Sequence, residues 1–76
     1  MQKKYVVCLV EFDEIGNKIP KQITFDGQSF VVDKVLQVKN CASLKAGGFG
    51  ERYTIRVQGK QTYIFFEEGK WFVEAK

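Results

Sequence analysis

The chain has 76 residues, of which 45% are hydrophobic and 14% aromatic, and its 12 basic and 9 acidic side chains give a formal net charge of +3. This length predicts one domain spanning residues 1–76, and the apolar content excludes a disordered chain. The mild, scattered positive charge permits a nucleic-acid partner without arguing for one. Because the chain has no histidine and two cysteines, the usual four-ligand metal site cannot be assembled, and we expect no metal and no cofactor.

The first predicted strand, residues 4–12, is apolar on both faces from Tyr5 to Val10. This pattern indicates a buried or central strand. The apolar run is too short for a signal-peptide core or a membrane span, so we expect a cytoplasmic protein without a membrane partner. Cys8 lies in this run and is expected to be a small core residue. We expect Cys8 and Cys41 to be reduced, although the sequence leaves a disulfide between them open.

The next two strands are predicted at residues 18–25 and 29–39, after a turn at residues 13–17. Pro20 cannot donate a ladder hydrogen bond, which predicts an edge or a bulge at the start of the second strand. Asp26-Gly27 is the strongest hairpin signal in the chain. In the third strand the alternation slips near Asp33-Lys34, where a β-bulge would restore the phase and bend the strand toward barrel closure.

Residues 40–50 are predicted to be the one long connection, with a helical turn over residues 42–46. Gly47 to Gly50 lack the lysine, the hydroxyl residue and the following helix of a phosphate-binding loop. We therefore interpret this segment as a loop rather than a phosphate site.

Residues 51–74 are predicted to form three antiparallel strands joined by tight turns at Gly59-Lys60 and Glu68-Gly69. With two-residue loops, Tyr53 faces Phe66. One face of this meander is uniformly apolar and is predicted to belong to the core. Its members are Tyr53, Ile55, Val57, Ile64, Phe66, Trp71 and Val73.

The opposite face of the meander carries aromatic rings beside arginines, and the expected register places Arg56 across from Tyr63. In one explanation the barrel covers part of this face and the arginines lie over the rings as cation–π contacts. In a second, the face binds single-stranded nucleic acid by stacking and phosphate contact. In a third, it is a protein-contact patch. The candidate binding face consists of Arg52, Thr54, Arg56, Tyr63, Phe65 and Phe72.

Six strands with short turns predict an all-β antiparallel domain, which we expect to be a small, partly open SH3-like barrel. An OB-like barrel and a small two-layer sandwich are the alternatives. Without histidine, and with no evident base beside either cysteine, we expect no catalysis. The sequence predicts a non-enzymatic binding or accessory module. The alternatives are a weak single-stranded nucleic-acid binder and a protein-contact or homodimer-forming module.

From Pro20 onward the chain combines a hairpin turn, a bulged strand and a tryptophan on the last strand. The residues concerned are Pro20, Ile23, Phe25, Gly27, Phe30, Val32, Val35, Leu36 and residues 52–57 and 70–74. In these features the chain resembles small uncharacterised β-rich proteins of bacteria. This resemblance implies a bacterial, cytoplasmic protein and carries over no activity.

Overall fold

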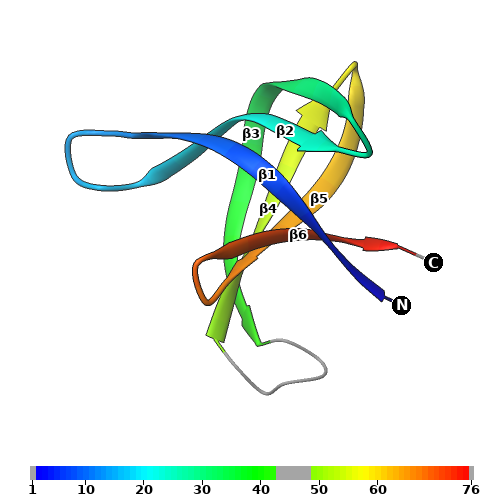
Figure 1. Ribbon diagram of the computed structural model, residues 1–76. Helices are drawn as coiled ribbons and strands as arrows, with labels where there is room; N and C mark the ends of the chain where they lie inside the picture. The colour runs from blue at the N-terminus through cyan, green and yellow to red at the C-terminus, as the bar shows by residue number, and fades with distance from the viewer. Residues whose placement is uncertain (1, 43–48, 76) are drawn as a thin grey trace.

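The structure, a computed structural model, describes residues 2–42 and 49–75, and its regular elements there are all strands (Figure 1). They are β1 (Gln2–Phe12), β2 (Lys18–Phe25), β3 (Gln28–Ala42), β4 (Phe49–Val57), β5 (Lys60–Glu67) and β6 (Lys70–Ala75). Each strand pairs antiparallel with the next, and β1 also pairs with β6, so a single sheet closes into a six-stranded barrel. This confirms the predicted small antiparallel barrel.

The connection between β3 and β4 is shorter than the predicted loop over residues 40–50, because β3 continues to Ala42 and β4 begins at Phe49. The helical turn predicted over residues 42–46 lies outside the described residues, apart from Ala42 in β3. Within the residues that the structure describes, no helix is long and apolar enough to cross a membrane.

Three hairpins turn at pairs of residues that both have positive φ. These pairs are Asp26-Gly27 (51° and 74°), Gln58-Gly59 (52° and 75°) and Glu68-Gly69 (53° and 77°). This conformation belongs to the type I′ turn, whose twist matches that of the strands and which favours glycine at the second position. The first and third turns confirm the prediction, whereas the second lies one residue earlier than Gly59-Lys60.

The earlier turn shifts the pairing of β4 with β5 by two residues. Tyr53 therefore faces Ile64 rather than Phe66, and Tyr63 faces Thr54 rather than Arg56. Because side chains alternate with a period of two, a shift of two residues leaves every side chain on its predicted face.

Register shifts bend β3 at two places. One lies between Val32 and Lys34, where a bulge was predicted, and the other lies between Val35 and Gln37. The bends let the start of β3 pair with β2 and the remainder pair with β4. Pro20 also lies beside a register shift, in the pairing of β1 with β2, as its missing amide hydrogen predicts.

The core is built from side chains of the predicted apolar face and of the inner sides of the other strands. Tyr53 and Phe66 pack against Trp71 with ring centroids 5.0 and 4.8 Å away. The Tyr53 hydroxyl donates a 3.2 Å hydrogen bond to Glu51 Oε1, and burial is the main reason that its pKa is raised. The buried core residues are Ile23, Val32, Tyr53, Ile55, Ile64 and Trp71.

A lysine at the start of β2 contacts β4 through an ion pair and β5 through a cation–π contact. Lys18 Nζ lies 3.1 Å from Glu51 Oε1 and 4.7 Å from the centre of the Phe66 ring. Pro20, two residues later, is almost completely buried. The Lys18 side chain therefore reaches β4 and β5 from the start of β2.

Candidate functional site

The predicted binding face lies on the outside of β4, β5 and β6, but its exposure is uneven. Thr54 and Phe72 are buried, Arg52 and Phe65 are half-buried, and Arg56 and Tyr63 are exposed. Thr54 and Phe72 can therefore offer a ligand little contact area, whereas Arg56 and Tyr63 are accessible.

Phe72 is buried on the outer side because neighbouring side chains cover it. The pairing of β1, β6 and β5 places Tyr5, Phe72 and Phe65 in one row. Phe65 stacks on Phe72 with centroids 5.2 Å apart, and Tyr5 meets Phe72 edge-on at 5.9 Å. Lys3 Nζ lies 4.8 Å from the centre of the Phe72 ring and forms a 3.0 Å ion pair with Glu67. The hydrogen bond to Glu67 raises the pKa of Lys3. These contacts occupy the Phe72 ring that a nucleic-acid base would need for stacking.

An arginine lies over an aromatic ring, as one explanation predicted, but the arginine is Arg52 rather than Arg56. The Arg52 guanidinium carbon is 4.8 Å from the centre of the Tyr63 ring, whereas Arg56 pairs with Gln61. Arg52 Nε is buried without a hydrogen-bond partner among the described residues. The Tyr63 ring is therefore in cation–π contact with Arg52, and Arg56 is the exposed arginine of this face.

A second surface, on the outer side of β1, was not predicted. Tyr5, Val7 and Leu9 are 57%, 72% and 62% exposed, and Val31 on β3 is 64% exposed. Leu9 pairs with Gln22, which pairs with Val31, so Leu9 and Val31 lie in one row across three strands with the half-buried Gln22 between them. We call Tyr5, Val7, Leu9 and Val31 the β1 apolar surface.

The β1 apolar surface corrects the expectation that β1 is buried on both faces. Isolated exposed apolar residues are normal, but neighbouring ones that form a large patch mark a site of interaction. The sequence contained the signal, because the outward positions Tyr5, Val7 and Leu9 are as apolar as the inward ones.

Residues 7–12 of β1 also have an unpaired edge. β1 pairs with β6 through residues 2–6 and with β2 through residues 7–12. Beyond Val6, one edge of β1 therefore faces no strand of the described chain. Figure 1 shows the β1–β2 hairpin projecting away from the other strands. An exposed strand edge is a template for pairing with another chain.

The tip of this hairpin is ordered by Asp13. Its Oδ1 accepts hydrogen bonds from the backbone amides of Ile15 at 3.0 Å and Asn17 at 2.8 Å, and its Oδ2 accepts one from the Asn17 side chain at 2.8 Å. These bonds, with the Asn17 side chain first, lower the pKa of Asp13. Phe12, at the end of β1, and Ile15, in the turn, are further exposed apolar side chains.

The described side chains contain no group of three or more histidine, cysteine or acidic residues that could hold a metal ion. Cys8 carries a free, half-buried thiol, and burial raises its pKa to about 11. A thiol that stays protonated is a poor nucleophile and a poor metal ligand. The Cys41 side chain, and with it the question of a disulfide, lies outside the described residues.

Comparison of the chain with protein-family models, with curated proteins and with solved structures finds no match. The interpretation of its surfaces therefore rests on their own geometry and chemistry.

Proposed function

We propose that this chain is a non-enzymatic protein-contact module that self-associates through β1. One observation carries the proposal: Val7 and Leu9 of the β1 apolar surface lie on the same strand segment, residues 7–12, as the unpaired backbone edge. Apolar area contributes to association through the hydrophobic effect, and a free edge supplies main-chain hydrogen bonds.

A second copy of the chain is the occupant that this edge suits. Two identical strands can pair antiparallel about a two-fold axis, and each then satisfies the backbone groups of the other. If the two-fold axis passes beside Leu9, the Leu9 side chains of the two copies lie opposite each other. The β1 apolar surfaces of the two molecules then adjoin. Burial of this surface would also help a domain that, at 76 residues, hides only about 60% of its unfolded surface by itself.

Single-stranded nucleic-acid binding by the outer face of β4 and β5 stays an alternative prediction. The geometry supports it less, because Phe72 is buried and Arg52 lies over Tyr63. Arg56 and Tyr63 are the exposed residues that would carry it. A bacterial origin is proposed on the sequence resemblance, and a cytoplasmic location on that resemblance and the short apolar run at the start of the chain.

Sedimentation measurements over a dilution series would test self-association. We expect the average mass of the wild-type protein to rise with concentration from that of one chain toward that of two. The Leu9→Lys variant should remain a monomer, because it places a charge in the β1 apolar surface. Leu36→Lys is the matched control, since Leu36 is also exposed but lies on β3, outside the β1 apolar surface. A mass of one chain at every concentration, or equal effects of the two substitutions, would contradict the proposal.

A further inference from the structure

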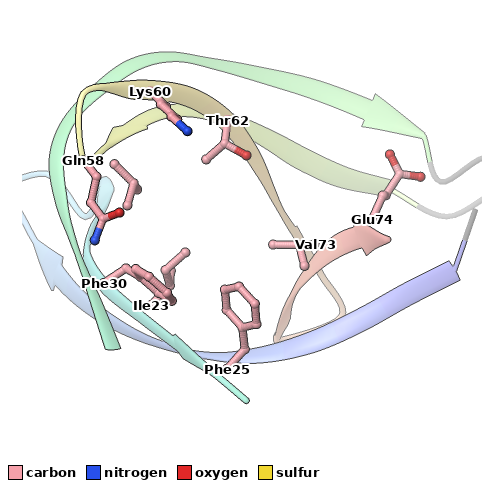
Figure 2. A pocket seen from close by; sticks show the side chains of 9 residues that line it. Ile23, Phe25, Phe30, Gln58, Lys60, Thr62, Val73 and Glu74 are labelled. Atoms are coloured by element: carbon pink, nitrogen blue, oxygen red, sulfur yellow. The ribbon is translucent and has the colours of Figure 1, made fainter. Parts of the chain in front are cut away.

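A cavity of about 330 Å³ opens at one mouth of the barrel. Figure 2 shows Phe25, Val73 and Thr62 pointing into it from β2, β6 and β5. Its apolar lining comes from Ile23, Phe25, Phe30, Val57 and Val73. This volume lies near the lower end of the range of about 300–1,000 Å³ that is usual for ligand sites, and mouths of barrels are common places for them.

The mouth is open on one side because β5 and β6 diverge. β6 pairs with β5 through Phe72, Trp71 and Lys70, and its remaining residues, 73–75, pair with β1. Residues 60–64 of β5 pair with β4 on one edge. On the other edge they face no partner strand in the described chain. The cavity lies beside this gap, since Thr62 from β5 and Val73 from β6 both line it.

We propose that the gap between β5 and β6 binds an extended peptide, which adds a strand to the free edge of β5 and inserts one apolar side chain into the cavity. The free edge favours a peptide over a small apolar molecule, because backbone amide and carbonyl groups pair best with another backbone. In such recognition the main-chain hydrogen bonds supply affinity and the pocket selects the side chain.

The rim of the cavity carries charged side chains that can contact the peptide residues on either side of the inserted apolar side chain. Lys60 and Glu74 lie at different sides of the opening (Figure 2), and neither takes part in an ion pair among the described residues. They can contact an acidic and a basic flanking residue of the peptide. This site uses the edge of β5 and is independent of self-association through β1.

Amide NMR with a capped peptide, acetyl-Lys-Thr-Ile-Thr-Leu-Glu-amide, would test the inference. We expect saturable shifts concentrated on residues 60–64 and on Val73. N-methylation of successive residues, in separate peptides, removes one amide hydrogen at a time. Since alternate amides of a paired strand point toward the same neighbour, at least one of these peptides should bind about tenfold more weakly.

Val73→Phe fills the cavity and should abolish the shifts, whereas Val38→Phe enlarges an exposed valine away from the cavity and should leave binding unchanged. An unchanged amide spectrum outside the cavity would show that each variant is folded. The inference is overturned if millimolar peptide gives no saturable shifts, if Val73→Phe binds as tightly as the wild type, or if every N-methylated peptide binds as well as the parent.

Discussion

Truncation of Leu9 gives the most quantitative test of the proposed self-association. The side chain is 62% exposed in the single chain. Leu9→Ala removes three carbon groups, each worth about 0.8 kcal/mol when fully buried. Scaling by the exposed fraction gives about 1.5 kcal/mol for each copy and about 3 kcal/mol for a symmetric dimer. The dissociation constant should therefore rise about 100-fold.

Sedimentation equilibrium on wild-type protein, Leu9→Ala and the matched control Leu36→Ala would measure this change. Urea unfolding at a concentration where the protein is monomeric supplies the second readout. There, Leu9→Ala should lower the free energy of unfolding by no more than about 1 kcal/mol, because only the smaller part of the side chain is covered in the single chain. An unchanged dissociation constant, or a large loss of stability in the monomer, would refute the assignment of Leu9 to an interface.

Three other predictions concern the core, the thiol and the outer face. Ile55 is completely buried, so Ile55→Ala should lower the free energy of unfolding by about 2–5 kcal/mol in urea denaturation, and a near-neutral effect would contradict the barrel core. The pKa of Cys8, raised to about 11 from 9.0, favours the neutral thiol in the folded state. The contribution of the neutral Cys8 thiol to the free energy of unfolding should be complete below pH 9.0 and should fade as the pH rises toward 11. In a Cys41→Ser variant, a disulfide reagent at about pH 8 should label Cys8 quickly only after unfolding, and fast labelling of the folded protein would disprove its protection. If the outer face binds single-stranded nucleic acid, a mixed-sequence oligonucleotide should shift the amides of Arg56 and Tyr63 in a salt-sensitive manner, whereas absent or scattered shifts would end that alternative.

The strand pattern of this chain could be predicted from short-range signals. Alternation with a period of two separates inward from outward residues in β4, β5 and β6, and an Asp-Gly or Glu-Gly pair positions two of the turns. The bulge near Asp33-Lys34 follows from a break in the same alternation. The register of β4 with β5 was missed, because Gly59 could be either the first or the second residue of its turn. The positive φ of Gln58 decides it.

The candidate surfaces depended more on tertiary structure. The sequence identified Arg52 and Tyr63 as members of one face, but the guanidinium lies over the ring only through a diagonal contact between neighbouring strands. Burial of Phe72 likewise depends on Tyr5 and Lys3, which come from the other end of the chain. No pattern local to residues 51–74 contains that information.

The sequence alone thus determined the type, order and inward faces of the strands, because these follow from residue alternation and turn chemistry within a few positions. Tertiary structure decided where the barrel leaves surface and edge without a partner. β1 divides its pairing between β6 and β2, and β6 pairs with β1 from Trp71 to Ala75 but with β5 only from Lys70 to Phe72. Both arrangements result from closure between the first and last strands. The exposure of the β1 apolar surface, and of the cavity beside the gap between β5 and β6, is therefore a property of the closed sheet. Both depend on which distant strands meet and where they part.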